Sequence, residues 1–398
     1  MDLTARNASL QDIAALLTEQ RGRALDIVAP ATALRSVGGN LVVTGSEPIL
    51  SDEGVTSSDG TYVPTVVAEE GLAAKLQIPL AYVRRMRAER PDLFDANVNG
   101  WLGGGHLPSG VGPADLPNRV EGGDYHWPAD PRSFMVRTFR GDDGGPGVLR
   151  AFLSQSYKVI DNLDVLTAAL DGVRQAGVEV DITGADLTER RMYVRIAAPA
   201  IQALAPTLLG NYRSPFTGNT GADNPTVFAG FVLSNSETGC GAFTITPRLT
   251  VQVCNNGMTM TKDALRSIHI GGKMDEGVIR WTDDTQEKNL ALVAAKTRDA
   301  VATFLDTAYV EKALAAIEEQ ATHKLAKPAE AIQIVSTRLR YTEAQTAGIL
   351  DHFIRGGDTT AGGVLHAVTS YAQVIPDADE AAEFEESGLR ALEVAASL

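Results

Sequence analysis

The chain has 398 residues, of which 44% are hydrophobic, and its formal net charge is −15 at pH 7. This length has room for two or three domains with an ordinary hydrophobic core. The acidic total and a pI near 4.9 argue against a protein that coats duplex nucleic acid through its overall field, although a local basic groove stays open.

The cysteines and the hydropathy pattern indicate the cellular setting. Cys240 and Cys254 are too few for a disulfide framework, so we expect two reduced thiols. The N-terminal residues lack the layout of a signal peptide, and no apolar run approaches the roughly 18 residues of a membrane span. We therefore expect a cytoplasmic protein with no membrane contact. No cluster of Cys and His residues offers the roughly four ligands of a zinc site, so no metal or other cofactor is expected.

Residues 1–125 are predicted to form a mixed N-terminal region that ends in a Gly/Pro-rich linker. Residues 9–22 have the apolar spacing of a short helix. Apolar stripes interrupted by prolines predict further helices over residues 69–102, and the second of these carries Arg84, Arg85 and Arg87. These arginines fit a solvated basic face balanced by nearby carboxylates, or alternatively a helix that contacts phosphates. A helix-turn-helix DNA reader has no support beyond the spacing.

Residues 126–285 are predicted to form the core of an α+β fold, an antiparallel sheet built from β-hairpins with packed helices. A first hairpin pairs residues 134–140 with residues 148–153 across a turn-rich connection. An amphipathic helix follows and ends at Gly177. A second hairpin comes after this helix.

The second hairpin carries the most suggestive surface pattern. Apolar residues alternate along its second strand with Arg191, Tyr193 and Arg195, which are therefore expected on an exposed face. Guanidinium groups beside a ring suit single-stranded nucleic acid, because arginines hold phosphates and Tyr193 can stack on bases. A structural explanation stands beside this one, since Glu179 and Asp181 lie on the partner strand and can pair with the arginines across the ladder.

A long alternating strand is predicted over residues 243–254. Its odd positions are mostly apolar and its even positions polar, which indicates one buried and one exposed face. Pro247 lies in the apolar row and cannot donate to a ladder, which favours an edge position or a bulge. The strand runs into a turn at Asn255, Asn256 and Gly257.

Further cations complete the predicted nucleic-acid-binding set. Lys158 precedes the helix of the core, and Lys262 and Arg266 follow the alternating strand. Lys262 and Arg266 are included because they belong to a cluster of cations within a dozen residues.

An enzyme is the least supported class. It would need Cys254 or His269 in a pocket with Asn256 and Glu237. No paired carboxylates, nucleophile elbow or metal motif accompanies these residues, and no Ser or Cys stands at a diagnostic spacing from His269. We therefore predict no catalytic residue.

Residues 286–398 are predicted to form a long-helix C-terminal region. Neither Gly nor Pro occurs from residue 286 to residue 325, and the apolar spacing predicts a long helix with room for a break at residues 306–309. Such length favours packing across a domain or between subunits. The end of the chain after residue 376 is rich in Asp and Glu, which is typical of a solvated helix end or a disordered tail.

Several passages resemble a known family. They are SQSYKVIDN at 154–162, SNSETGCGAFTITPRLTVQVCNNGM at 234–258 and the turn at 269–272, with a looser match at 72–102. In these passages the chain resembles the phage/plasmid-like family called domain of unknown function 932. Asn255 departs from the Cys-Thr-Asn-Gly sequence usual in that family. The resemblance implies an origin in a phage or mobile element and action in a bacterial cytoplasm, and it implies no particular activity.

We therefore expect a protein of DNA metabolism, a single-stranded DNA binder or annealer in recombination, that forms a homo-oligomer. Its predicted contacts are Arg84, Arg85, Arg87, Lys158, Arg191, Tyr193, Arg195, Lys262 and Arg266. The alternative is an oligomeric structural or interaction protein, or an acidic factor that imitates the charge of DNA, without catalytic activity. The two differ in whether the basic side chains converge on one groove or are paired to carboxylates.

Overall fold

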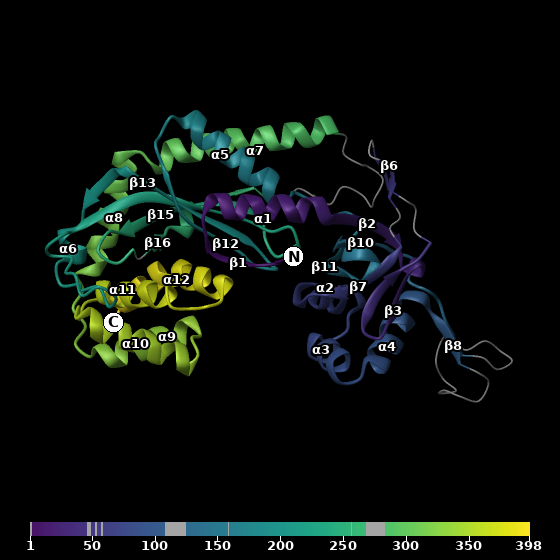
Figure 1. The fold of residues 1–398 in the computed structure, drawn as a ribbon. Coiled ribbons are helices and arrows are strands. Elements are labelled where there is room, and N and C mark those ends of the chain that lie inside the picture. Colours follow the sequence, from purple (N-terminus) through teal and green to yellow (C-terminus); the bar gives the residue numbers. More distant parts are fainter. Residues whose placement is uncertain are drawn as a thin grey trace.

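The computed structural model describes residues 2–45, 49–51, 54–56, 59–107, 125–157, 159–255, 257–267 and 283–398. It is an α+β fold with two large sheets that lie in different parts of the molecule (Figure 1). The predicted fold class is therefore confirmed. Most of the predicted linker and the turn at 269–272 lie outside the described residues.

The first sheet belongs to the N-terminal part of the chain. Its strand order is β2-β10-β11-β7-β4-β3, and every pairing is antiparallel except that of β11 with β7. The strands are β2 (Ala24–Pro30), β3 (Leu34–Val37), β4 (Asn40–Val43), β7 (Gly60–Pro64), β10 (Ser133–Phe139) and β11 (Gly147–Ser154). They pack against α2 (Val66–Leu76), α3 (Leu80–Glu89) and α4 (Pro91–Gly103). Two small hairpins project from this part, β5 (Ile49–Ser51) with β6 (Gly54–Thr56) and β8 (Gly105–Leu107) with β9 (Tyr125–Trp127).

The second sheet is antiparallel throughout. Its order is β1-β12-β13-β14-β15-β16, and β17 also pairs with β15. The strands are β1 (Ala5–Ala8), β12 (Asp181–Leu187), β13 (Met192–Leu204), β14 (Thr226–Asn235), β15 (Phe243–Val251), β16 (Gly257–Thr259) and β17 (Leu265–Ser267). Helix α1 (Leu10–Arg23), capped by the Ser9 side chain, carries the chain from β1 of this sheet to β2 of the first.

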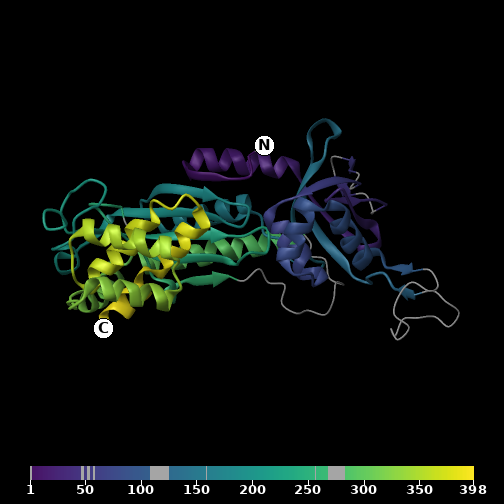
Figure 2. The ribbon, with the colours of Figure 1, turned by 90° about the horizontal axis from the view of Figure 1, so that it is seen from below.

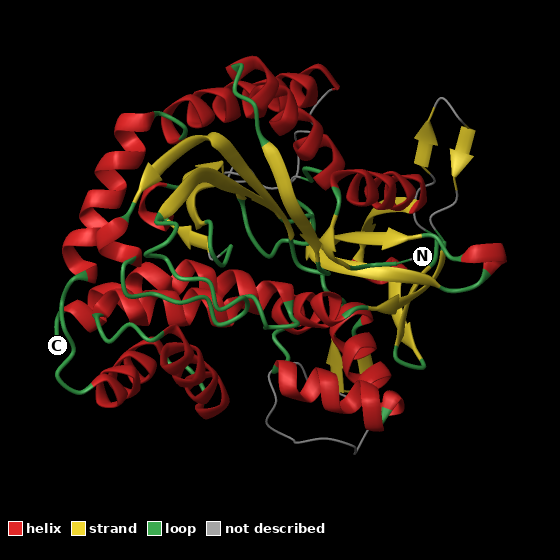
Figure 3. Ribbon diagram, turned by 60° about the vertical axis from the view of Figure 1, so that its left-hand side comes forward, coloured by secondary structure: helices red, strands yellow, loops and turns green. Residues whose placement is uncertain are grey.

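Helices cover both faces of the second sheet (Figures 1 and 3). Helices α5 (Asn162–Ala176) and α7 (Asp283–Phe304) pack together on one face. Helices α11 (Ala361–Ala372) and α12 (Ala378–Ala396) lie over the other, with α8 (Thr307–Ala321), α9 (Pro328–Leu339) and α10 (Glu343–Gly356) beside them (Figure 2). The short helices are α6 (Pro206–Leu209), η1 (Ala31–Ala33), η2 (Asp142–Gly144) and η3 (Thr261–Asp263).

Strand β15 shows the consequence of this double cover. Its apolar side chains, such as Ile245, are buried as predicted. Its polar side chains Thr246, Arg248 and Thr250 are also buried, so the predicted exposed face is covered over the middle of the strand. Alternation assigns side chains to two faces, but it does not say whether a helix covers the polar one. Pro247 lies between the stretches of β15 that pair with β17 and with β16, a place where its missing N–H is tolerated.

The hydrophobic cores divide the chain differently from the predicted regions 1–125, 126–285 and 286–398. One core gathers buried side chains from residues 25–152, so the hairpin of β10 and β11 belongs with the N-terminal part. The other runs from α1 through the second sheet to α12. The C-terminal helices therefore share one core with the second sheet, because their apolar side chains are buried together with those of the sheet and of α5.

The C-terminal helices refine two predictions. The long helix breaks where room for a break was predicted, since α8 begins after Asp306, whose side chain accepts a hydrogen bond from the Tyr309 N–H. The acidic end is neither solvated on all sides nor disordered. It forms α12, which buries one face that includes Phe384 and Leu392. The numerous carboxylates obscured this apolar spacing in the sequence.

Replacing Gly172 tests the contact between α5 and α7. A Cβ at this position would collide with the carbonyl oxygen of Ala294 and lie 2.8 Å from the Cβ of Thr297. We expect Gly172→Ala to lower the free energy of unfolding by about 1–3 kcal/mol, measured by urea denaturation. Gly22→Ala is the matched control, because that helical glycine has open space around it and alanine should be neutral or stabilise by roughly 0.5–1 kcal/mol. Equal effects of the two changes would contradict the close crossing.

His366 makes stability depend on pH. Its ring is fully buried, stacks on Tyr212 at 4.1 Å and donates from Nε2 to the Leu208 carbonyl at 3.2 Å. Burial lowers the pKa of His366 to about 4. The unfolded chain takes up this proton near pH 6.5, so acidification from pH 7 to pH 5 should cost roughly 2 kcal/mol of stability through this residue alone. The cost should level off below about pH 4. Denaturation of His366→Gln across this range should show a shallower slope than the wild type, and an unchanged slope would contradict the assignment.

Candidate functional site

The predicted basic and aromatic strip on β13 is covered by α12. Tyr193 is 6% exposed, and its hydroxyl donates to Asp379 of α12 at 2.9 Å. Arg195 donates from Nη1 to Asp186 at 2.5 Å, and Arg191 donates from Nε to the Cys240 carbonyl at 2.9 Å. Burial, reinforced by the Asp379 carboxylate, raises the pKa of Tyr193 and keeps its phenol protonated as a donor. The expected exposed strip is therefore wrong, since its ring is buried and its arginines are hydrogen-bonded within the protein.

The carboxylate that pairs with Arg195 differs from the expected ones. Asp181 lies opposite Ala197, two positions beyond Arg195, and the structure pairs neither it nor Glu179 with the strip. Asp186 lies opposite Tyr193 on β12 and is fully buried. Its two oxygens accept hydrogen bonds from Arg195, from Arg6 at 2.6 Å and from the Asn7 N–H at 2.7 Å. A register shift between Ile182 and Gly184 contributes to this difference, and a bulge of that kind has no legible signal in the sequence.

The arginines of α3 lie in the N-terminal part of the molecule. Arg84 donates to Glu70 at 2.9 Å, and Arg85 donates to Glu89 at 3.0 Å. Their side chains remain 45% and 77% exposed. Arg87 is more enclosed, because it bonds to Glu69 and to the carbonyl of Gly39 and its side chain is only 22% exposed. Carboxylates thus pair with all three arginines, and the face is solvated at Arg84 and Arg85 but largely enclosed at Arg87.

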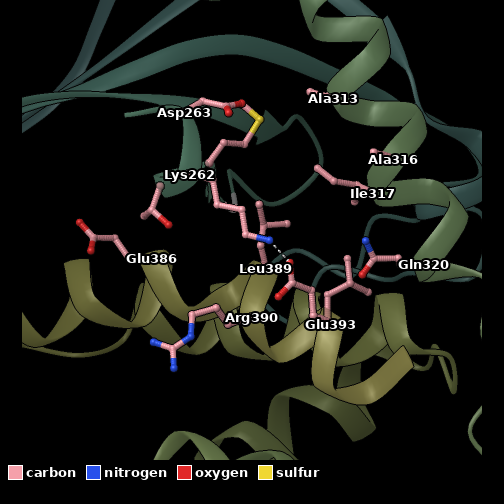
Figure 4. Close-up of a pocket in the computed structure, with 13 residues that line it drawn as sticks. Lys262, Asp263, Ala313, Ala316, Ile317, Gln320, Glu386, Leu389, Arg390 and Glu393 are labelled. Atoms are coloured by element: carbon pink, nitrogen blue, oxygen red, sulfur yellow. Dashed lines mark hydrogen bonds and ion pairs between the residues drawn. The ribbon is translucent and has the colours of Figure 1, made fainter. Parts of the chain in front are cut away.

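Lys262 lies apart from both the strip on β13 and the arginines of α3. It is part of η3 and extends over a pocket of about 210 Å³ between η3, α8 and α12, where it pairs with Glu393 (Figure 4). Aliphatic side chains such as Ile317 and Leu389 form much of the pocket wall (Figure 4). Lys158 lies outside the described residues, and of Arg266 only the backbone, in β17, is described. Those predicted cations whose side chains are described are therefore spread over separate surfaces.

The Asn-Ser-Glu passage has a structural role that the sequence did not reveal. Glu237 is buried, pairs with Arg150 and accepts a hydrogen bond from the Asn162 N–H. Although burial opposes its charge, the arginines around it lower the pKa of Glu237. The fully buried Arg137 donates to the Glu237 carbonyl at 2.8 Å and to two carboxylates, those of Asp26 and Asp161. Arg137 and Arg150 belong to the first sheet and Glu237 follows the second, so this network joins the two parts of the molecule.

The residues that the enzyme alternative requires are not brought together in the part of the chain that the structure describes. Glu237 is engaged in the network just described, and Asn256 and His269 lie outside the described residues. Cys254 is buried and takes part in no disulfide bond within the described residues. In the part of the chain that the structure describes, no group of three or more His, Cys, Asp or Glu side chains is placed to hold a metal ion. None of the helices described there is long and apolar enough to cross a membrane.

Replacing Asp186 tests whether the ion pairs on the covered face of β13 stabilise the fold. We expect Asp186→Asn to destabilise the fold by about 3–5 kcal/mol, because it leaves Arg6 and Arg195 without their buried carboxylate. Chemical denaturation measures the change. Asp299→Asn is the matched control, since this carboxylate is 70% exposed and pairs with Arg298 on the surface, and its loss should cost less than about 0.5 kcal/mol. A loss at Asp186 as small as the control's would overturn the structural role.

Comparison with known proteins agrees with the passages that suggested a family. The model of the family described as Domain of unknown function (DUF932) matches residues 151–378. This stretch includes the Asn-Ser-Glu passage, most of the second sheet and the helices that cover it up to the start of α12. Searches of curated proteins and of solved structures gave no match. The match covers more than half of the chain, and the protein therefore belongs to the DUF932 family.

Proposed function

We propose that this protein binds single-stranded DNA through the outer surface of α3, and that it does so in the DNA metabolism of a phage or mobile element. The surface is defined by four residues, Tyr82, Arg84, Arg85 and Arg90. The single observation in its favour is that these side chains stay accessible while the strip on β13 is covered. Arg85 is 77% exposed, Arg90 60% and Tyr82 64%.

The ion pairs on α3 do not prevent phosphate binding. Arg85 and Arg90 have carboxylate partners that also face solvent, Glu89 and Asp92. The partner of Arg84, Glu70, is more enclosed at 26% exposure. Exposed pairs such as those of Arg85 and Arg90 contribute only about 0–1 kcal/mol each. A phosphate can therefore replace the carboxylate at low cost, whereas it cannot reach the buried pair of Arg195 and Asp186.

Tyr82 adds the second element that single strands need. Its ring lies on the same short helix as Arg84 and Arg85 and is mostly exposed. Stacking of a base on such a ring contributes about 1–3 kcal/mol. The neighbouring carboxylates and the net charge of −15 oppose binding, so we expect a weak and strongly salt-dependent interaction that a homo-oligomer would strengthen by presenting several copies.

Binding to a labelled oligonucleotide of about 20 nucleotides at about 50 mM salt, followed by fluorescence anisotropy, tests the proposal. We expect the double variant Arg84→Ala, Arg85→Ala to lose about tenfold in affinity and Tyr82→Ala a similar amount. The salt slope should become shallower in the arginine variant, because fewer phosphates are contacted. Arg174→Ala is the matched control, since that arginine is 83% exposed and pairs with Asp171 on α5.

Two outcomes would contradict the proposal. One is no retention of the oligonucleotide at low salt, and the other is equal binding by the α3 variants and the control. The alternative function, an oligomeric interaction protein without a nucleic-acid partner, is favoured by large exposed aliphatic residues, Leu204 at 69% and Ile354 at 68%. A defined oligomer in light scattering together with no binding would favour that alternative.

A further inference from the structure

We propose that the polar cavity between the second sheet and α12 is a binding site for a small organic molecule that carries one oxyanion group. The cavity has a volume of about 260 Å³ and is separate from the α3 surface. Strands β1, β12, β13 and β15 form its floor, and the end of α11 and the first half of α12 form its roof. The proposal does not depend on DNA binding.

The charges around the cavity are unbalanced. Three guanidinium groups line it, those of Arg6, Arg195 and Arg248. Two carboxylates face them, because Asp186 binds Arg6 and Arg195 while Glu385 accepts from Arg248 at 3.0 Å. Among these groups the guanidinium charges thus exceed the carboxylate charges by one, and the side chains of Arg195 and Arg248 are only 12% and 5% exposed. An excess of positive charge in an enclosed place is costly, so a ligand of charge −1 would be stabilised here.

Hydrogen-bonding capacity is unused as well. Arg195 has five N–H groups but makes one hydrogen bond within the described residues, from Nη1 to Asp186, and its side chain is only 12% exposed. Arg248 binds Thr250 and Glu385 through its two terminal nitrogens, while its buried Nε–H has no acceptor there. A planar guanidinium with unpaired N–H groups matches the geometry of a carboxylate or phosphate.

The guanidinium of Arg248 is held in place before any ligand arrives. It lies against Gly257, where any side chain would collide with Nε and Nη2. It donates hydrogen bonds to Thr250 on the same strand and to Glu385 on α12, two elements of the core. A positively charged group fixed in this way loses little conformational freedom on binding.

The size of the cavity sets the class of ligand. At about 30 Å³ per molecule the volume corresponds to roughly eight or nine waters, more than a bare carboxylate or phosphate requires. Polar groups from Thr183, Thr250 and Asn255 line the remainder, and few apolar side chains do so. The ligand is therefore a small hydroxylated compound with a carboxylate or a phosphate ester, and a flat or apolar molecule is disfavoured.

Thermal shift and isothermal titration calorimetry of the full chain with three related probes test the site. The probes are glycerate, glycerol 3-phosphate and uncharged glycerol. We expect at least one of the two anions to raise the melting temperature and give a saturable heat, and glycerol to do neither. The preferred anion distinguishes a carboxylate from a phosphate ligand. A response to glycerol equal to that of the anions, or no response to any probe, would overturn the proposal.

Two variants locate the binding. Glu385→Gln removes one negative charge but keeps a hydrogen-bonding group for Arg248, so it should tighten anion binding on the order of tenfold. Ala381→Leu places a larger side chain in the cavity, which Ala381 lines, and should abolish binding. Ala74→Leu, at an exposed position of α2, is the matched control. Anion binding that survives Ala381→Leu and ignores Glu385→Gln would place the ligand elsewhere and refute the site.

Discussion

The contact between the acidic helix α12 and the polar face of the second sheet governs most of this structure. Carboxylates of α12 reach the sheet at two points, where Asp379 accepts from Tyr193 and Glu385 accepts from Arg248. Burial without a partner would cost considerable free energy for the arginine and tyrosine of the sheet and for the glutamate of the helix. Buried together they satisfy one another, and the apolar residues of α12, such as Phe384 and Leu392, complete the core. An acidic terminal segment and a basic strand pattern are therefore two halves of one interface.

A second polar centre joins the two parts of the molecule. Glu237 and Arg137 lie among carboxylates and guanidinium groups from both parts, and both side chains are buried. Buried ion pairs contribute little net stability, but losing one partner is expensive. Such a network therefore specifies how the two sheets meet more than it strengthens the fold. The polar Asn-Ser-Glu passage therefore occurs beside a buried strand because its glutamate helps to join the two parts of the molecule.

The two proposed binding sites differ in how far their arginines are buried. Arg85 on α3 and Arg90 directly after it have partners that face solvent and can exchange them for phosphates, which suits a weak contact with a long polyanion. Arg195 and Arg248 are enclosed, and their partners are fixed by strands and by α12. An enclosed guanidinium cannot follow a polymer backbone, but it can hold one small anion in a set orientation. Burial, rather than the number of arginines, decides which kind of ligand each group can take.

Local patterns in the sequence determined the α+β class, the alternating strands β13 and β15, helix α1 with its Ser9 cap and the break at Asp306, because each depends on residues near one another in the chain. Only the tertiary structure decided that α12 covers the polar face, that Asp186 rather than Asp181 meets Arg195, and that β10 and β11 join the first sheet. Arg137 is a buried charge within a largely apolar strand, and its partners lie 24, 100 and 111 residues away in the sequence. Alternation fixes which side of a strand a residue occupies. What packs against that side depends on contacts between distant segments, and these have no signature within any one of them.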